Sequence, residues 1–518
     1  MEPHQVKVLD KVVVLDFGSQ FTQLIARRVR ECNIYSEILP FDTPIEEIKK
    51  LNPKALILSG GPSSVYDDEA PIASEDIIEL GIPILGICYG MQLIGHYFGA
   101  KIKAASKREY GRAELTIVGE DALFDGFNGK STVWMSHADK IEELPQGFKK
   151  LGYSDNSEFA AIRNIEKSIY GLQFHPEVAH TENGSLIIEN FVRKVSEISG
   201  DWTTQVFIEE AIDDIRNRVG DEKVLCAVSG GVDSTVMAVL LNRALGKNVT
   251  CVFIDTGLLR LNEAEQTMKM FSGIDGMNVQ LFDRKENFCS ALAGISDPEV
   301  KRKAIGKTFI DVFSEIADKF DEHKYLAQGT LYPDVIESRP VKGPSETIKS
   351  HHNVGGLPKE MNFELIEPFR ELFKDEVRIV GREFGLSEEV IGRHPFPGPG
   401  LAIRCPGEVT EKNLKLLQLA DDIFISELHK SGYYDKVWQA FAVLLPVKSV
   451  GVMGDKRTYS KVISLRTVTS VDGMTADWGH LPHELLGKIS DRIINEVEGV
   501  NRVLYDISSK PPATIEWE

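Results

Sequence analysis

The sequence predicts an α/β fold: two doubly wound, mostly parallel-sheet domains followed by a C-terminal α+β domain. Its 518 residues are enough for roughly three domains of ~150 residues each. Short apolar runs alternate with helical stretches up to about Arg393, which is the pattern of parallel strands buried between helices. The proline- and glycine-rich segment from His394 to Gly400 then excludes a helix, and the order of elements changes after it. We therefore predict domains at residues 1–201, 202–393 and 394–518.

The first predicted domain begins with strongly apolar runs, such as Lys11 to Asp16 (KVVVLD). Short apolar runs bounded by turn residues are typical of buried strands. Helical stretches lie between or after these runs, so we expect helices on both faces of the sheet. The predicted strands are 11–16, 55–59, 83–88, 112–118, 131–136 and 168–174, and the predicted helices are 19–31, 43–50 and 90–98.

The second domain repeats this alternation, and the third departs from it. The predicted strands of the second domain are 223–228, 249–254, 278–282 and 324–328. In the third domain a helix near 409–430 precedes predicted strands at 437–445, 447–453 and 458–469. The tail from Ser508 to Glu518 contains Ile515 and Trp517. Because large apolar side chains are usually buried, we expect the tail to dock on the fold.

Composition indicates an ordinary globular protein, with 42% hydrophobic and 26% charged residues. The formal net charge of −19 argues against nucleic acid as the main partner, since nucleic-acid-binding proteins present a basic surface. The six cysteines are scattered without a CxxC pair, which argues against a zinc or disulfide scaffold and favours a reducing cytoplasm. The N-terminus has no apolar signal core, and no apolar run approaches 18 residues. We therefore expect neither a standard secretion signal nor a membrane span.

A glycine pair lies between a predicted strand and a predicted helix of the second domain. The segment follows strand 223–228 and precedes a helix predicted at 236–245; it consists of Ser229, Gly230, Gly231, Val232, Asp233, Ser234 and Thr235. Glycines permit a tight turn, and a helix N-terminus offers free N–H groups to an anion. The hydroxyls add donors, and the Asp233 carboxylate is able to hold a metal or to cap the helix. A plain strand–turn–helix connection does not need these residue types, so we predict a phosphate or pyrophosphate site.

A cysteine occupies a similar junction in the first domain, in the segment Gly86-Ile87-Cys88-Tyr89-Gly90. The flanking glycines permit a sharp turn that lifts the thiol out of the sheet, and a helix N-terminus favours the thiolate. A lone cysteine in an apolar run is more often a small core residue. The segment Gly60-Gly61-Pro62 argues against a purely structural role for Cys88, because this segment follows another predicted parallel strand. The N–H groups of Gly61 and Tyr89 are therefore predicted to form an oxyanion hole.

The segment Gln173-Phe174-His175-Pro176-Glu177 contains the remaining groups of a possible catalytic set. Side chains two residues apart in an extended chain point the same way, and Pro176 favours extended geometry at His175. Considered alone, His-Pro-Glu is also compatible with a simple turn. In combination with the cysteine elbow, it predicts a triad of Cys88, His175 and Glu177.

These segments resemble the class I (triad) glutamine amidotransferases over about residues 10–200, through Gly60-Gly61-Pro62, Gly86-x-Cys88-x-Gly90-x-Gln92 and His175-Pro176-Glu177. The resemblance implies that Cys88 attacks the carboxamide of glutamine and that His175 transfers the proton. Glu177 would orient and stabilise the imidazolium. Water then releases glutamate, and ammonia is the useful product.

The loop at 229–235 resembles that of the N-type ATP pyrophosphatases, which cleave ATP between the α and β phosphates and adenylate a carbonyl oxygen.

Gly306-Lys307-Thr308 is similar to the end of a Walker A loop, but that motif needs glycine where Lys301 stands and a strand before it. We predict a charged helix over 299–318 instead. The basic cluster from Lys301 to Lys307 is then either a solvated helix face or an anion-binding lid. Adjacent His351 and His352 point oppositely in an extended chain, which argues against a metal site.

Four further segments extend the resemblance nearly end to end, to the glutamine-hydrolysing GMP synthetase family. They are KSHHNVGGLP (349–358), EPFRELFKDEVR (367–378), RHPFPGPGLAIR (393–404) and KPPATIEWE (510–518). The resemblance implies an amidotransferase domain, an ATP pyrophosphatase domain and a C-terminal dimerisation domain in that order. It also implies a homodimer.

The implied substrates are ATP, xanthosine 5′-monophosphate (XMP) and L-glutamine. Mg²⁺ would accompany ATP, with Asp233 as its protein ligand, and no organic cofactor is implied. By resemblance, Arg302 and Lys510 contact the XMP phosphate, which suits their charge, and Glu516 contacts a base edge. Two alternatives use the same loop. Another glutamine-dependent ATP-pyrophosphatase amidase is disfavoured by the Cys–His–Glu order, and a tRNA-modifying enzyme by the acidic charge and unpaired cysteines.

Overall fold

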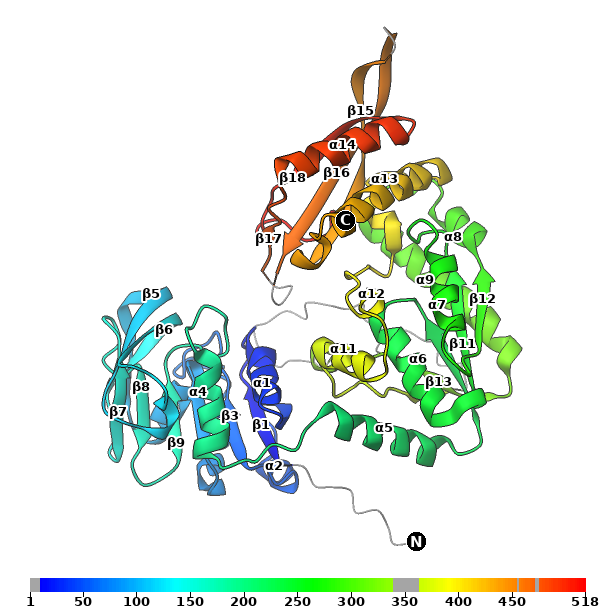
Figure 1. The fold of residues 1–518 in the computed structure, drawn as a ribbon. Coiled ribbons are helices and arrows are strands. Elements are labelled where there is room, and N and C mark those ends of the chain that lie inside the picture. The colour runs from blue at the N-terminus through cyan, green and yellow to red at the C-terminus, as the bar shows by residue number, and fades with distance from the viewer. Residues whose placement is uncertain (1–9, 339–362, 454–455, 471–474) are drawn as a thin grey trace. The chain divides into compact units, whose positions relative to one another are not determined.

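A computed structural model describes residues 10–338, 363–453, 456–470 and 475–518 of the chain. The chain gathers into two compact units, the first formed mainly by residues up to Phe207 and the second mainly by residues from Ile208 onward. Figure 1 shows the helices and strands of each unit along the chain. The segment KSHHNVGGLP, with His351 and His352, lies outside the described residues.

The first unit is built on a nine-stranded sheet with the order β2-β1-β3-β4-β9-β8-β7-β5-β6. The first five strands in this order run parallel, and the other four are attached antiparallel. The strands are β1 (Lys11–Asp16), β2 (Tyr35–Pro40), β3 (Ala55–Leu58), β4 (Ile84–Ile87), β5 (Lys101–Ile117), β6 (Lys130–Glu143), β7 (Phe148–Tyr153), β8 (Ala161–Asn164) and β9 (Ile169–Leu172). The helices are α1 (Thr22–Glu31), α2 (Ile45–Lys50), α3 (Tyr89–Tyr97) and α4 (Gly184–Asn190).

The apolar runs of this unit form strands where the sequence predicts them. Every residue of β3 and β4 is buried, as expected for central parallel strands covered on both faces. The sequence pattern does not predict β2, β7 and β8, because polar residues interrupt their apolar runs. The strand predicted at 112–118 is the second part of β5, which extends over 17 residues. The antiparallel half of the sheet is therefore larger than the sequence indicates.

The second unit contains a five-stranded sheet, β12-β11-β10-β13-β14, in which all strands are parallel. The strands are β10 (Lys223–Val228), β11 (Val249–Asp255), β12 (Val279–Asp283), β13 (His323–Ala327) and β14 (Glu364–Ile366). The helices along this part of the chain are α5 (Thr204–Val219), α6 (Val232–Leu245), α7 (Glu263–Ser272), α8 (Lys285–Leu292), α9 (Pro298–Ala317), α10 (Tyr332–Ser338), α11 (Lys374–Glu383) and α12 (Glu388–Ile391). This is the second doubly wound sheet that the sequence predicts.

The charged helix predicted at 299–318 is α9. It begins after Asp297, whose side chain accepts a hydrogen bond from the N–H of Val300 at 2.9 Å, and Pro298 occupies its first turn. Both residues are favoured at helix starts. Gly306-Lys307-Thr308 lies inside this helix, which excludes a Walker A loop there.

The C-terminal part of the second unit has a four-stranded sheet in which β15 (Gln439–Met453), β16 (Lys456–Thr469) and β17 (Asp477–Trp478) are antiparallel neighbours. β18 (Val500–Asp506) pairs parallel with β16. The strands predicted at 437–445 and 447–453 form one strand, β15, whose register shifts between Leu445 and Lys448. α13 (Glu411–Lys430) and α14 (His483–Glu496) complete this part.

One hydrophobic core connects the two parts of the second unit. Leu225 and Leu326 from the parallel sheet belong to the same buried cluster as Leu401 and Phe424. The predicted domain boundary at 393/394 therefore crosses a continuous core. It remains a prediction that the two parts act as separate domains.

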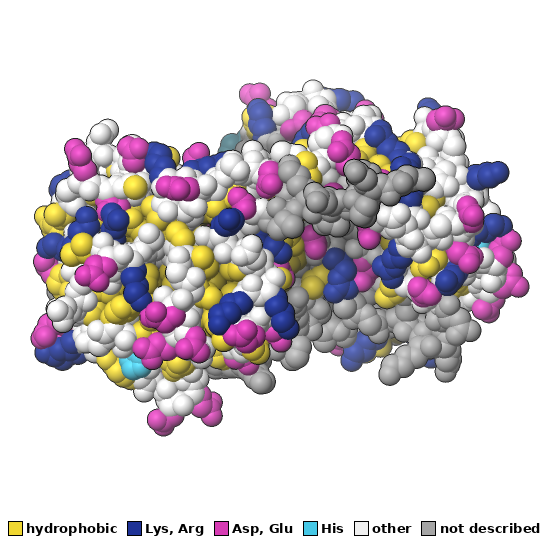
Figure 2. Space-filling model, turned by 90° about the horizontal axis from the view of Figure 1, so that it is seen from below, with side chains coloured by type: hydrophobic (Ala, Val, Ile, Leu, Met, Phe, Trp, Pro, Cys, Tyr) yellow, Lys and Arg dark blue, Asp and Glu magenta, His cyan; other side chains and the backbone are white. Residues whose placement is uncertain are grey.

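The molecular surface carries charges of both signs. On the face drawn in Figure 2, Lys and Arg side chains are interspersed with Asp and Glu. Within the described ranges, no helix has both the length and the apolar composition needed to cross a bilayer.

Candidate active sites

Cys88 occupies the turn between β4 and α3, in a strained backbone conformation. Its φ angle is 52°, a left-handed value that non-glycine residues adopt rarely and mostly at functional sites. A Cβ atom on Gly86 would lie 2.5 Å from the carbonyl of Gly90, and one on Gly90 would lie 2.4 Å from the carbonyl oxygen of Leu58. Only glycine fits at these two positions, which is the geometry predicted for a nucleophile elbow.

The thiol of Cys88 is 4% exposed and lies among polar groups. Its Sγ donates to the carbonyl oxygen of Ser136 at 3.5 Å, and Nε2 of Gln173 donates to Sγ at 3.8 Å. A Cβ atom built on Gly60 would lie 3.0 Å from Cε1 of His175 and 3.7 Å from Cβ of Cys88. The loop after β3 therefore lies directly against both side chains.

His175 and Glu177 form a buried ion pair beside this thiol. Nδ1 of His175 lies 2.7 Å from Oε1 of Glu177, and Glu177 is fully buried. Burial acts to lower the pKa of His175, but the charge of Glu177 and a hydrogen bond to Cys88 outweigh it and raise that pKa to about 10. The imidazole is therefore protonated at neutral pH, with Nδ1 directed to the carboxylate. The structure brings the three predicted triad residues together.

Gly61 and Tyr89, the predicted oxyanion-hole residues, also lie next to each other. A Cβ atom on Gly61 would meet the carbonyl oxygen of Phe17 at 2.7 Å and the ring of Tyr89 at 3.4 Å. Neither backbone N–H donates a hydrogen bond to another described residue. Two amide donors are thus available near Cys88, while their contact with a reacting oxygen remains a prediction.

The loop at 229–231 joins β10 to α6 with a tight turn. Gly230 has a φ angle of 73°, and a Cβ atom there would lie 2.7 Å from Oγ1 of Thr267, so both conformation and space require glycine. The N–H of Ser229 donates to Oγ of Ser234 at 3.1 Å, and the N–H of Gly231 donates to Oγ of Ser229 at 3.3 Å. The hydroxyls predicted as ligand donors therefore also hold the shape of the loop.

Helix α6 begins at Val232, earlier than the predicted Val236. Asp233, Ser234 and Thr235 thus lie in its first turn, where the helix dipole favours an anion. Oδ2 of Asp233 lies 3.2 Å from Nζ of Lys374. Oδ1 of Asp233 and Oγ1 of Thr235 are buried without a partner among the described residues. Polar atoms of this kind are uncommon in folded proteins, so this turn has hydrogen-bonding capacity that no described residue uses.

The three predicted nucleotide contacts have different surroundings. Arg302 is exposed on α9 and pairs with Glu299 at 2.6 Å. The backbone N–H of Lys510 donates to the carbonyl of Ala476 at 2.7 Å. Glu516 accepts hydrogen bonds from Nη2 of Arg404 and from Nε2 of Gln439, each at 2.8 Å. The Glu516 carboxylate is therefore held by the interior of the second unit.

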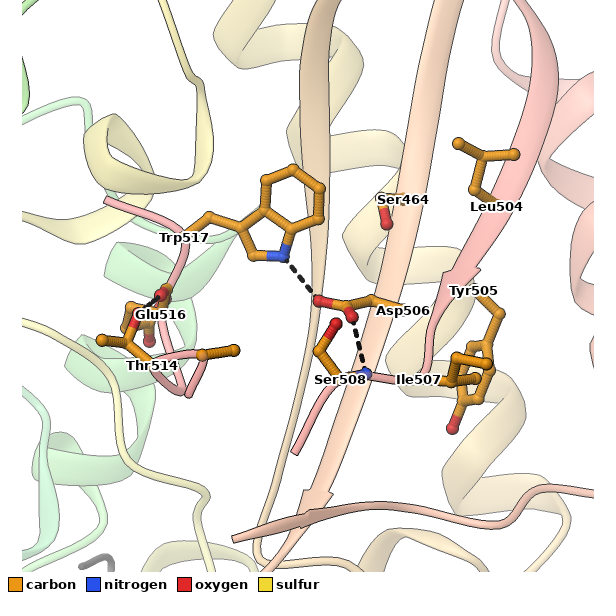
Figure 3. A pocket seen from close by; sticks show the side chains of 10 residues that line it. Ser464, Leu504, Tyr505, Asp506, Ile507, Ser508, Thr514, Glu516 and Trp517 are labelled. Carbon is orange, nitrogen blue, oxygen red and sulfur yellow. Dashed lines mark hydrogen bonds between the residues drawn. The ribbon is translucent and has the colours of Figure 1, made fainter. Parts of the chain in front are cut away.

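Glu516 also lines a pocket of about 550 Å³ formed by the C-terminal tail and the sheet. Figure 3 shows Trp517 across it from Leu504, with the indole N–H directed to Asp506 at 3.0 Å. Neither Arg302 nor Lys510 is among its lining residues, which are Ser464, Leu504, Tyr505, Asp506, Ile507, Ser508, Ala513, Thr514, Glu516 and Trp517. The buried guanidinium of Arg466 donates to the carbonyls of Thr514 and Ile515, each at 2.8 Å. Docking of the tail is thus confirmed.

Some residues of these sites escape prediction from sequence. Lys374 lies 141 residues from its partner Asp233, so no local pattern connects them. Gln173 stands beside the predicted His175, yet only the fold shows that it touches the thiol. In the basic cluster of α9, Arg302, Lys303 and Lys307 are exposed, which fits the predicted solvated face. Lys301 does not fit it: this residue is fully buried and pairs with Glu518 at 2.6 Å.

Three protein families match parts of the chain. The class-I glutamine amidotransferase family matches residues 13–195, and the GMP synthase C-terminal domain family matches residues 426–517. The tRNA methyl transferase HUP domain matches residues 222–278, the region of the glycine-rich loop.

Relatives match the chain over almost its whole length. The GMP synthase [glutamine-hydrolyzing] of Aquifex aeolicus is 59% identical, covering 98% of this chain and 99% of the relative. The proteins of the same name from Chlorobium phaeovibrioides and Maridesulfovibrio salexigens are 58% and 57% identical, each covering 98% of this chain and 100% and 99% of the relative.

Proposed function

The chain belongs to the glutamine-hydrolysing GMP synthase family, and from this membership we infer that it makes GMP from XMP, ATP and L-glutamine. AMP, pyrophosphate and L-glutamate are the other products. In the structure, the main support for this assignment is the buried His175–Glu177 pair beside the thiol of Cys88. Such an arrangement serves nucleophilic attack on a carbonyl carbon.

In the amidotransferase half, the Cys88 thiolate attacks the carboxamide carbon of glutamine. The C–N bond breaks as the His175 imidazolium gives its proton to the leaving nitrogen, which departs as ammonia. A water molecule then attacks the thioester, His175 takes its proton, and glutamate and the thiolate are released. Glu177 keeps the imidazolium oriented, and the N–H groups of Gly61 and Tyr89 stabilise the oxyanion. The hydrogen bond between His175 and Cys88 and the His175–Glu177 pair support these roles.

In the ATP pyrophosphatase half, O2 of XMP attacks the α-phosphorus of ATP and the bond to pyrophosphate breaks. Ammonia then displaces AMP from C2 to give GMP. The turn from Ser229 to Thr235 receives the departing pyrophosphate, because N–H groups, hydroxyls and a helix N-terminus converge there. Lys374 adds a positive charge at Asp233.

A magnesium ion would neutralise phosphate charge in this half. The described residues contain no group of three His, Cys, Asp or Glu side chains suited to a metal. Mg²⁺ commonly uses one or two carboxylates and substrate phosphates, so the unpartnered Oδ1 of Asp233 fits as its protein ligand. Arg302 and Lys510 are proposed for the XMP phosphate and Glu516 for the base.

We also propose the three functional domains 1–201, 202–393 and 394–518 and a homodimer formed through the last of them. Exposed apolar side chains on β15, β16 and β18 support the dimer. Val450 and Tyr459 are direct partners across β15 and β16, and contiguous exposed apolar side chains commonly mark protein interfaces. Val452 is 72% exposed, Tyr459 62% and Leu504 44%.

Product analysis tests the assignment directly. With XMP, ATP and glutamine we expect GMP, AMP, pyrophosphate and glutamate in equal amounts. Formation of ADP and inorganic phosphate instead would contradict a pyrophosphatase loop, and pyrophosphate formation that does not depend on XMP would contradict the acceptor.

A further inference from the structure

The carbonyl group of Gly230, in the middle of the glycine-rich turn, is held from outside that turn. Nη1 of Arg393 donates to this oxygen at 2.7 Å. Arg393 lies 163 residues further along the chain, between α12 and the proline- and glycine-rich segment that follows. The arginine therefore connects the turn to a distant part of the second unit.

Arg393 is itself fixed by a buried carboxylate. Its Nη2 lies 2.6 Å from Oε1 of Glu263, the first residue of α7, and Glu263 is 4% exposed. The other oxygen of Glu263 accepts a hydrogen bond from the N–H of Arg260 at 2.8 Å. Both carboxylate oxygens are thus used. The two terminal nitrogens of Arg393 are held by two different acceptors, Glu263 and the Gly230 carbonyl, which leaves the guanidinium little freedom to move.

The orientation of the Gly230–Gly231 peptide decides what the turn presents to an anion. The C=O and N–H of one trans peptide unit point in opposite directions. A peptide between two glycines rotates with little steric cost, and a rotation would turn a carbonyl oxygen toward the phosphates. A carbonyl oxygen repels phosphate, whereas an N–H attracts it. Within the turn, the N–H of this peptide donates to Oγ of Ser229 at 3.3 Å, and Arg393 holds its carbonyl oxygen at 2.7 Å. Both contacts oppose the rotation, and the shorter one comes from outside the turn.

We propose that Arg393 is a positioning residue for the pyrophosphate turn: held by Glu263, it keeps the carbonyl of Gly230 directed away from the nucleotide. This inference rests on the proposed role of residues 229–235 in ATP cleavage. Arg393 acts through the backbone and is not assigned contact with the nucleotide.

The test uses ammonia-dependent GMP synthesis by the full-length protein, measured as initial rates at varied ATP. We expect Arg393→Gln to lower kcat/KM for ATP at least tenfold with a raised KM for ATP, while KM for XMP stays within twofold. Arg393→Lys, which keeps a cationic donor, should recover part of the loss. Arg382→Gln is the matched control, because Arg382 pairs with Glu388 at 2.9 Å on the surface of α11.

A double-mutant cycle separates positioning from general damage. If Arg393 works through its pairing with Glu263, Glu263→Gln alone should raise KM for ATP in the same direction, and the double variant should be no worse than the poorer single variant. Additive losses, or an Arg393→Gln enzyme with KM for ATP within twofold of wild type, would overturn the proposal. Should Arg393→Gln fail to fold, Arg393→Lys and Glu263→Gln give the same comparison.

Failure of this inference is distinguishable from failure of the proposed function. Asp233→Ala should abolish ammonia-dependent synthesis if the turn serves ATP cleavage. If Asp233→Ala is inactive and the Arg393 variants have normal KM for ATP, only the positioning role is wrong. If Asp233→Ala is fully active, the function proposed for the turn is wrong. The positioning role of Arg393 is then wrong as well.

Discussion

At the scale of single residues, the His175–Glu177 pair is the feature with the clearest chemical consequence. The pKa of His175 is about 10, so its imidazole carries a proton at neutral pH. A protonated imidazole is able to give its proton to a leaving nitrogen at once. Because Glu177 is fully buried, its charge acts on the imidazole with little screening.

Replacing Glu177 with Gln should remove most of the glutaminase activity. The neutral amide no longer stabilises the imidazolium and favours a different ring orientation, so we expect a loss on the order of 10²–10⁴-fold in kcat for glutamate release. Ammonia-dependent GMP formation, measured in parallel, should stay unchanged. Full glutaminase activity in this variant would contradict the triad.

The same pair should make stability depend on pH. The folded pKa of His175, about 10, lies above its ordinary value of 6.5. The contribution of the pair is therefore complete below pH 6.5 and is lost as the pH rises through about 10. Melting temperatures of wild type and Glu177→Gln should differ most at about pH 6.5 and converge near pH 10.5. A difference that stays constant over this range would show that the pair is not charged as described.

At the scale of elements, two strand–turn–helix junctions carry the proposed chemistry, and sequence predicts both because each is a local pattern. The triad residues and the 229–235 loop follow from short motifs with glycine at sterically demanding positions. Lys374 and Arg393 are not predicted as partners of this loop, since 141 and 163 residues separate the contacting groups. Among the strands, β3 and β4 are predicted from their continuous apolar runs, whereas β7 (FKKLGY) is missed because charged residues interrupt its pattern.

Two glycine substitutions should have opposite effects. A Cβ atom on Gly90 would meet the backbone of Leu58 at 2.4 Å, so Gly90→Ala should lower the free energy of unfolding by about 1–3 kcal/mol. Gly306 lies within α9, where a Cβ atom meets nothing within 4 Å. Gly306→Ala should raise the free energy of unfolding by about 0.5–1 kcal/mol. Denaturant titration measures both, and a destabilising Gly306→Ala would contradict the helical assignment of Gly306-Lys307-Thr308.

At the scale of the whole molecule, the two compact units each carry one of the two proposed half-reactions. The triad lies in the first unit and the glycine-rich turn in the second. The second unit also contains the C-terminal sheet, which carries exposed apolar side chains. The C-terminal sheet and the parallel sheet pack on one shared hydrophobic core. The sequence predicts the order of these parts, but it does not indicate the shared core, because contacts between distant segments leave no local pattern.

Replacing Leu504 with Lys should weaken the proposed dimer. Leu504 is 44% exposed on β18, so a charge there opposes burial between two copies. Light scattering should give the mass of two chains for wild type and a shift toward one chain for the variant. A wild-type protein with the mass of a single chain would contradict the dimer.

The division of chemistry between Cys88 and the glycine-rich turn is the central claim, and Cys88→Ala tests it most directly. The matched control is Cys32→Ala in the same unit, because burial raises the pKa of the Cys32 thiol to about 11, which disfavours the nucleophilic thiolate. GMP formation is measured for each variant with glutamine and, separately, with ammonium ions as nitrogen source. We predict that Cys88→Ala loses glutamine-dependent synthesis and retains ammonia-dependent synthesis at the wild-type rate, while Cys32→Ala retains both. Loss of both activities in Cys88→Ala, or retention of the glutamine-dependent one, would contradict the claim.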